Sequence, residues 1–228
     1  MTLCAAPDFG PVTITRLLAH FEQDAVKVLA ADDSALRVCL TAAKIAKLRR
    51  FLDRFDAADH QRRLTERGAR FVLRGEADYP PGLAQLSDAP PGLYVAGEAK
   101  FPAINLAIVG TRHASAYGRR IARTWAQRLA GAGVGIVSGL ALGIDAEAHA
   151  GAMEAGGFTA AVLGGGLDIV YPPENRALRD QIIAQGLLLS EFHLGRRVDR
   201  QSFPQRNRLV SGMCDAVLVV ESARRAAV

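Results

Sequence analysis

Between residues 104 and 220, short apolar runs alternate with longer amphipathic stretches, and this alternation limits the fold more than any other feature. The runs cover 106–109, 134–137, 159–163, 187–189 and 216–220. Their hydrophobicity is continuous rather than alternating, which is typical of parallel strands buried on both faces. The stretches between them predict helices over about 117–130, 144–155, 174–185 and 205–213. The sequence therefore predicts an α/β fold with a doubly wound, mostly parallel sheet.

The first third of the chain has a different character. Ile14, Leu17, Leu18 and Phe21 follow helical spacing, and less regular apolar spacing continues to about residue 55. Two Pro-Pro-Gly steps within 79–92 then mark a linker or the margin of the next domain. We predict a small helical domain over 1–70 and an α/β domain over 71–228.

Composition excludes several classes of protein. Half of the residues are hydrophobic and 22% are charged, as in ordinary globular proteins. No run approaches the roughly 20 apolar residues that span a bilayer, so no membrane association is predicted. The N-terminus has neither the basic nor the apolar region of a secretion signal. Three widely spaced cysteines without a C-x-x-C motif argue against a disulfide framework and against zinc. A cytoplasmic protein is expected.

Basic residues are unevenly distributed along this chain of net charge +5. Residues 99–144 contain six basic residues and no Asp or Glu, and five arginines within 196–208 are opposed only by Asp199. Guanidinium groups bind phosphate oxygens bidentately, although solvated surface faces are the plainer alternative. Both clusters adjoin the carboxyl ends of predicted strands, where ligands of such sheets bind. This position favours an anion site.

The loops at that edge carry glycines and hydroxyl groups but no standard nucleotide signature. In the first loop, Arg112, Ser115 and Tyr117 adjoin a predicted helix N-terminus, which is an intrinsic anion site. No G-x-x-x-x-G-K-[ST], G-x-S-x-G or H-E-x-x-H motif occurs. The glycines of 131–135 end a helix, and 164–166 lacks the third glycine of a dinucleotide fingerprint because Ile169 stands there.

Single polar and aromatic residues receive structural interpretations first. We expect Asp145 to satisfy backbone N–H groups at a helix N-terminus. We expect His149, four residues after Asp145 on the same helix, to form a local hydrogen bond with it. Catalysis by Glu191 is the less favoured alternative. Trp125 is expected in the core, and Cys214 as a small buried hydrophobe. No nucleophile, base and orienting group can be assembled from spacing alone.

Taken together, the loops resemble the DNA-processing protein A family, also called DprA or Smf. The motifs that carry the resemblance occur in one order: Ile108-Val-Gly-Thr-Arg112, Ser115-x-Tyr117-Gly118, Ile136-Val-Ser-Gly-Leu-Ala-Leu-Gly-Ile-Asp145 with His149, Ala161-Val-Leu-Gly-x-Gly-Leu-Asp168, Tyr171-Pro172-x-x-Asn175, Leu189-Ser-Glu191, and Phe203-Pro-x-Arg-Asn-Arg208 with Gly212. The resemblance covers about 70–220. Gly10-Pro11-Val12 before a helix is similar to the start of the family's small sterile-alpha-motif-like domain.

The resemblance implies an extended Rossmann-like fold and a function. Family members bind single-stranded DNA during natural transformation, shield it from nucleases and help load the RecA recombinase. They form homodimers and act as binding proteins rather than enzymes, without a cofactor or metal. The site residues implied by motif are Arg112, Ser115, Tyr117, Gly139, Gly164, Gly166, Arg206, Asn207 and Arg208. Tyr117, Tyr171 and Phe203 are the candidate stacking platforms for bases.

Two departures leave alternatives open. His193 stands where the family commonly has proline, and the sequence stops at Val228, where the family continues with a further helix and strands. A truncated chain is therefore expected to dimerise poorly, and a non-functional remnant is one alternative. The other alternative is a nucleotide-hydrolysing Rossmann enzyme of the phosphoribohydrolase type. Its P-G-G-x-G-T-x-x-E signature is not matched by 163–168, which lack the threonine and the glutamate.

Overall fold

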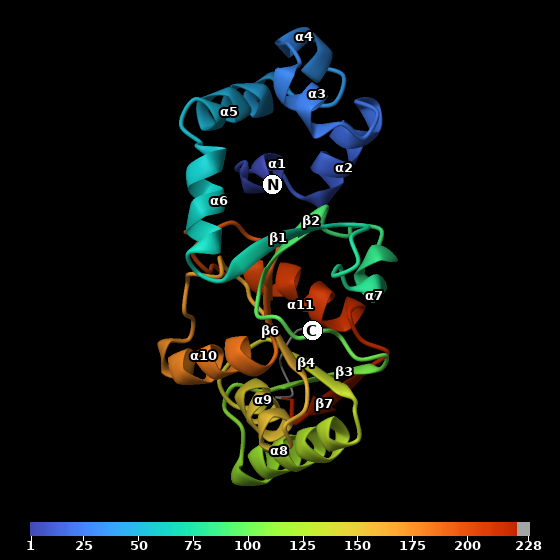
Figure 1. The fold of residues 1–228 in the computed structure, drawn as a ribbon, viewed down its shortest axis with the longest axis vertical. Helices are drawn as coiled ribbons and strands as arrows, with labels where there is room; N and C mark the ends of the chain where they lie inside the picture. Colours follow the sequence, from blue (N-terminus) through green and yellow to red (C-terminus); the bar gives the residue numbers. More distant parts are fainter. Residues whose placement is uncertain (223–228) are drawn as a thin grey trace.

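The computed structural model describes residues 1–222. The sequence also predicts that Arg224 and Arg225 discourage the apolar strand over 216–220 from pairing with another chain, and both arginines lie outside the described residues. A seven-stranded sheet in the order β1-β2-β6-β5-β4-β3-β7 forms the centre of the molecule (Figure 1). The strands are β1 (Ala69–Leu73), β2 (Gly92–Ala96), β3 (Asn105–Gly110), β4 (Gly135–Ser138), β5 (Thr159–Val162), β6 (Leu187–Ser190) and β7 (Ala216–Val220). Only β2 is antiparallel to its neighbours. The predicted α/β class with a mostly parallel sheet is confirmed.

Helices cover both faces of this sheet. The helices α8 (Ala116–Gly131), α9 (Ile144–Glu154) and α10 (Arg176–Gln185, after the short 3₁₀ turn Pro173–Asn175) follow β3, β4 and β5. The opposite face is covered by α7 (Pro81–Ala84) and α11 (Ser202–Gly212). Successive residues of β4 alternate between the two layers, because Ile136 packs beneath α8 and α9 while Val137 packs beneath α11. Two-sided burial explains why these strands read as continuous apolar runs.

The packing of α8 corrects the prediction for Trp125, which is 50% exposed rather than in the core. The buried side of α8 consists of small residues, namely Gly118, Ala122, Ala126 and Ala130. Small residues let α8 lie close against α9 and the sheet, so the contact has no room for an indole. Trp125 lies beside this small-residue stripe and is only partly covered.

Six helices precede the sheet and lie at the far end of the molecule from α8 (Figure 1). They are α1 (Thr2–Ala5), α2 (Pro11–His20), α3 (Ala25–Ala30), α4 (Asp33–Leu36), α5 (Ala42–Leu52) and α6 (Ala57–Thr65). The buried side chains of α1 to α5, among them Leu17, Val28, Leu36 and Leu48, form a separate core, whereas Leu64 of α6 packs into the core of the sheet. Side-chain caps from Asp24, Asp32, Thr41 and Asp56 fix four of the helix starts.

The last strand, β7, forms one edge of the sheet and pairs with β3. Leu218 and Val220 pack on the side of α8, whereas Val217 and Val219 are 48% and 59% exposed. Within 1–222, one face of this apolar strand is therefore covered and the other meets solvent. No helix in the described part of the chain is long and apolar enough to cross a membrane.

Candidate functional site

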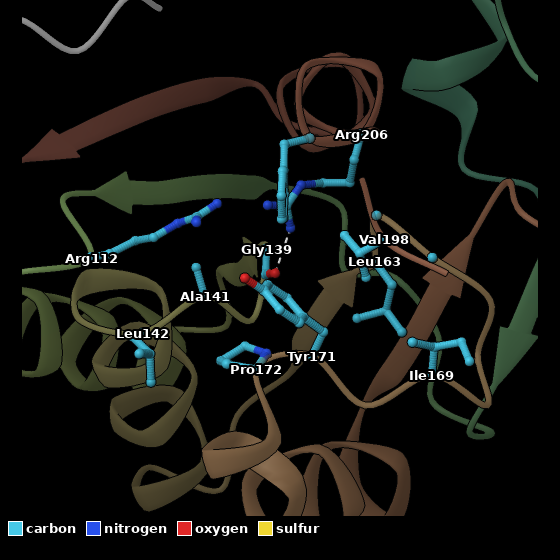
Figure 2. Close-up of a pocket in the computed structure, with 13 residues that line it drawn as sticks. Arg112, Gly139, Ala141, Leu142, Leu163, Ile169, Tyr171, Pro172, Val198 and Arg206 are labelled. Atoms are coloured by element: carbon cyan, nitrogen blue, oxygen red, sulfur yellow. Dashed lines mark hydrogen bonds between the residues drawn. The ribbon is translucent and has the colours of Figure 1, made fainter. Parts of the chain in front are cut away.

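A pocket opens at the carboxyl ends of β3, β4 and β5, beneath α11 (Figure 2). The loops after these strands supply its floor and walls, and the segment after β6 and α11 close it from above. Thirteen residues line it: Arg112, Gly139, Ala141, Leu142, Leu163, Gly164, Gly165, Ile169, Tyr171, Pro172, Val198, Phe203 and Arg206. The fold thus places a cavity at the sheet edge where ligands of parallel sheets bind.

Arg206 descends from α11 into this pocket and holds its back wall. Its Nη1 donates to the carbonyl oxygen of Val162 at 2.7 Å and to that of Gly139 (Figure 2). The carboxylate of Asp145 accepts from the backbone N–H groups of Gly139 (3.1 Å) and Ala141 (3.3 Å). The loop after β4 is thereby fixed between a buried cation and a buried anion.

Burial raises the pKa of Asp145 and lowers that of Arg206, and the opposite charge of each partner counteracts both shifts. The expectation that Asp145 satisfies backbone N–H groups is confirmed, but the groups belong to the loop that precedes α9 and not to the helix itself. A side chain at position 139 would collide with Arg206, because a Cβ there would lie 1.8 Å from Nη1. Glycine at this position is a packing requirement of the buried arginine.

Arg112 provides the exposed cation of the pocket. Its Cζ lies 4.5 Å from the centroid of the Phe203 ring, in a cation–π contact. The Tyr171 and Phe203 rings are tilted to each other with centroids 5.9 Å apart. Figure 2 shows Arg112 extending over the cavity from one side and Tyr171 standing below it. One guanidinium and two aromatic rings therefore meet where the pocket opens.

The chemistry of the lining is apolar and cationic. Two of the thirteen lining residues are charged, and both are arginines. Leu142, Leu163, Ile169 and Val198 supply aliphatic surface, and two glycines expose backbone on the β5 side. Such a site accepts a flat aromatic group against its rings while a guanidinium contacts an attached anion.

Four of the nine predicted site residues line this pocket: Arg112, Gly139, Gly164 and Arg206. Gly166 lies beneath the segment after β6, where its N–H donates to the carbonyl of Arg196 at 2.8 Å. Asn207 is exposed beside the pocket and accepts from Nε of Arg206 at 3.1 Å. It therefore orients the buried guanidinium rather than lining the cavity.

Ser115 and Tyr117 lie at the start of α8, and the predicted anion site there already holds a carboxylate of the chain. Glu221, directly after β7, accepts from the N–H (3.0 Å) and from the hydroxyl (2.9 Å) of Ser115. Ser115 also caps the helix by accepting from the N–H of Gly118. Tyr117 projects outward and is 66% exposed. The helix N-terminus attracts an anion as expected, but the anion is internal.

Arg208 points away from the pocket, into a second cleft between the sheet and the N-terminal helices. It forms ion pairs with Glu191 and, at 3.3 Å, with Asp88. Burial raises the pKa of Glu191 to about 7, against the opposing effect of Arg208. Oε1 of Glu191 is buried without a hydrogen-bond partner among the described residues. Glu191 is therefore outside the candidate pocket.

The groups considered for catalysis are not brought together. His149 is fully buried on α9, and its Nδ1 lies 2.7 Å from the hydroxyl of Thr159 rather than bonding Asp145. Burial lowers the pKa of His149 to about 3, so the ring is neutral near pH 7. Cys214 is half-buried, and burial raises the pKa of its thiol to about 12. Among residues 1–222, no group of three His, Cys, Asp or Glu side chains is placed to hold a metal ion.

Sequence reasoning missed the aliphatic part of the pocket. Nothing in the residue types of this part signals a ligand. Its members are Ala141, Leu142, Leu163, Gly165, Ile169, Pro172 and Val198. Their only signal is position, since most follow directly after predicted strands. Tyr171 and Phe203, expected as stacking platforms, do line the cavity, whereas Tyr117 does not.

Comparison with known proteins gives one consistent match. The sequence profile of the family described as DNA recombination-mediator protein A matches residues 70–227. Protein Smf of Synechocystis sp. is 40% identical over 223 residues, which are 93% of this chain and 55% of that relative. The chain spans about half the length of the curated relatives it matches.

Two solved structures have a fold similar to that of this chain. The DNA processing protein A of Streptococcus pneumoniae has a TM-score of 0.81 at 31% identity, covering 99% of this chain and 77% of that one. The DNA processing protein A of Helicobacter pylori has a TM-score of 0.62 at 31% identity, covering 69% and 72%. The latter structure is described in terms of that protein's single-stranded DNA binding mode.

Proposed function

The chain belongs to the DNA recombination-mediator protein A family, and from this premise we propose that it binds single-stranded DNA through the pocket beneath α11. Family membership agrees with the prediction of a binding protein rather than an enzyme. In this proposal, Tyr171 and Phe203 take up an unpaired base, and Arg112 contacts a neighbouring phosphate. Arg206 and Asp145 keep the loop after β4 in place and stay inside the protein.

The observation that supports the proposal best is the contact between Arg112 and Phe203 at the opening of an otherwise apolar pocket. Base–aromatic stacking tolerates any sequence, because every base has a π face. A duplex keeps its bases paired and stacked internally, so it cannot offer them to these rings. A preference for single strands over duplex follows.

We further propose that this binding serves natural transformation and recombination. A strand held in the pocket is less open to nucleases, and the bound complex helps to load the RecA recombinase. The related protein of Helicobacter pylori, with its described single-stranded DNA binding, supports the first step. Nuclease protection and RecA-driven strand exchange, each measured with and without the protein, test the later steps.

The binding step is tested by fluorescence anisotropy with labelled oligo(dT) and a duplex of equal length. We expect Arg112→Ala and Phe203→Ala each to weaken oligo(dT) binding by roughly tenfold. Arg37→Ala, an exposed arginine among the N-terminal helices, is the matched control and should bind as wild type. Equal affinity of wild type and Arg112→Ala, or tighter binding of duplex, would refute the proposal. Release of base from nucleoside monophosphates would instead favour the enzyme alternative.

A further inference from the structure

The outer flank of α8 carries four exposed and two half-buried residues, which we name the α8 stripe. It consists of Tyr117, Arg120, Ile121, Thr124, Trp125 and Arg128. Steps of three, four, seven and eight residues place these side chains on one side of a helix. Tyr117 is 66% and Trp125 50% exposed, and both arginines are exposed as well. Large aromatic side chains in solvent at this spacing call for a partner surface.

The two flanks of α8 differ in how their arginines are used. On the flank that faces α9, Arg123 bonds Glu147 (3.1 Å) and Glu154, and Arg119 lies 4.0 Å from Glu147. On the α8 stripe, Arg120 and Arg128 have no carboxylate oxygen within 4.0 Å among the described residues. Arg120 instead lies over the Tyr117 ring, with Cζ 5.8 Å from its centroid. Between the two flanks of α8, the stripe is thus the one whose arginines have no acidic partner among residues 1–222.

Charge and ring chemistry together select the partner. The α8 sequence contains no Asp or Glu, and the carboxylate of Glu221 at its first turn is already bound by Ser115. Arginines beside exposed aromatic rings are the combination by which proteins follow single-stranded nucleic acid, with rings stacking on bases and guanidinium groups contacting phosphates. A protein partner would instead need an acidic and apolar surface of matching shape.

The stripe also begins shortly after the pocket residue Arg112 along the chain. Arg112 lies on the loop that leads from β3 directly into α8, and Tyr117 occupies the first turn of that helix. At 1.5 Å per residue, Trp125 lies about 12 Å further along the helix axis and Arg128 about 16 Å. A strand that leaves the pocket past Arg112 thus meets a ring, a cation, a second ring and a second cation in turn.

We propose that the α8 stripe is a second contact surface for the same single-stranded DNA, used only by strands long enough to extend beyond the pocket. This inference rests on the proposed function. Tyr117 and Trp125 stack on two bases of the strand, Arg120 contacts a phosphate between them, and Arg128 contacts a phosphate beyond Trp125. The consequence is length-dependent affinity, because sites of this kind cover about 4–16 nucleotides.

Trp125 is the single tryptophan of the chain, so its intrinsic fluorescence reports the stripe directly. Wild-type protein is titrated with oligo(dT) of about four and of about 20 nucleotides, which bracket the usual site sizes. We expect the longer strand to quench the tryptophan emission, because the indole stacks on a base. The shorter strand should bind, by anisotropy of a labelled copy, while leaving the emission unchanged.

Variants separate the stripe from the pocket. Trp125→Ala should weaken binding of the longer strand by roughly tenfold, with no change for the shorter one, and Trp125→Phe should restore most of the loss. Arg128→Ala should reduce the salt dependence for the longer strand only. Arg119→Ala, which removes an exposed arginine from the flank of α8 that faces α9, is the matched control. Circular dichroism and sedimentation velocity of each variant check folding and oligomeric state.

The outcomes distinguish the two proposals. If neither strand binds, the proposed function fails and the stripe proposal fails with it. If both strands bind, but the longer one neither quenches the Trp125 emission nor binds more weakly to Trp125→Ala, the proposed function is retained and the stripe proposal is overturned. If Trp125→Ala changes sedimentation and leaves the longer strand's affinity intact, the stripe is a protein contact and the proposal is likewise overturned.

Discussion

Gly139 shows how a single residue type can be required by a neighbour rather than by a ligand. A Cβ at this position would displace the Arg206 guanidinium, and the carbonyls of Gly139 and Val162 would lose their buried donor. We expect Gly139→Ala to lower the free energy of unfolding by about 2–4 kcal/mol, measured by urea denaturation. Gly10→Ala, where nothing lies within 4 Å of the added atom, is the control. Equal stability of the two variants would contradict this packing argument.

The fold raises the pKa of Glu191 far enough that a pH dependence of stability can be measured. Its pKa rises to about 7 from the ordinary 4.5, because burial disfavours the carboxylate. The folded state therefore holds the proton more tightly than the unfolded state does. The resulting stability is fully present below pH about 4.5 and is lost as the pH rises through about 7.

Glu191→Gln removes this titration and isolates it. We expect the unfolding free energy of wild type minus that of the variant to fall by about 3 kcal/mol between pH 4.5 and 8. Chemical denaturation at several pH values measures the difference, with the exposed Glu174→Gln as control. A difference that stays constant, or rises with pH, would show that Arg208 keeps Glu191 ionised throughout.

At the scale of one element, α8 depends on its first turn. Ser115 caps the helix by accepting from the N–H of Gly118 at 3.0 Å, and its hydroxyl donates to Glu221. Ser115→Ala should cost about 1 kcal/mol of stability, whereas Ser115→Thr keeps the acceptor and should cost much less. Thermal unfolding of both variants decides the matter. Similar losses for alanine and threonine would mean that the cap contributes little.

The same helix shows where sequence reasoning succeeds and where it stops. Its bounds follow from helical spacing, and the prediction of 117–130 agrees with Ala116–Gly131. The prediction that Trp125 lies in the core was wrong, because hydrophobicity alone does not reveal that a row of glycine and alanine forms the buried contact. Glu221 was missed as the anion at the helix start, because its approach depends on β7 lying beside β3. Long-range pairing of this kind carries no local signal.

For the whole molecule, alternation of apolar runs and helices was enough to predict the parallel sheet and the edge at which the pocket lies. The separate core of α1 to α5 supports our proposal of two domains, over 1–70 and 71–228, and α6 connects them by packing Leu64 into the core of the sheet. The strands β1 and β2, of which β2 runs antiparallel to its neighbours, were not predicted. They complete the sheet beyond β6 through pairing with distant residues, such as Val95 with Leu189.

The exposed edge of β7 affects the behaviour of the whole molecule in solution. Val219 is 59% exposed on a strand that pairs on one side only within residues 1–222, so its other backbone row can pair with another chain. We expect Val219→Lys to reduce concentration-dependent self-association, measured by sedimentation velocity. Val12→Lys changes a valine that is 67% exposed on α2 and serves as control. An equal effect of both substitutions would show that added charge, not the edge, controls association.

The central claim, that Arg112 holds a phosphate of single-stranded DNA in the pocket, is tested most directly by salt dependence. Oligo(dT) affinity is measured over a series of salt concentrations for wild type and Arg112→Ala. Each phosphate contact contributes a slope of about −0.7 in log affinity against log salt. We predict weaker binding for the variant and a slope less negative by about 0.7. Weaker binding with an unchanged slope, or no effect at all, would contradict the claim.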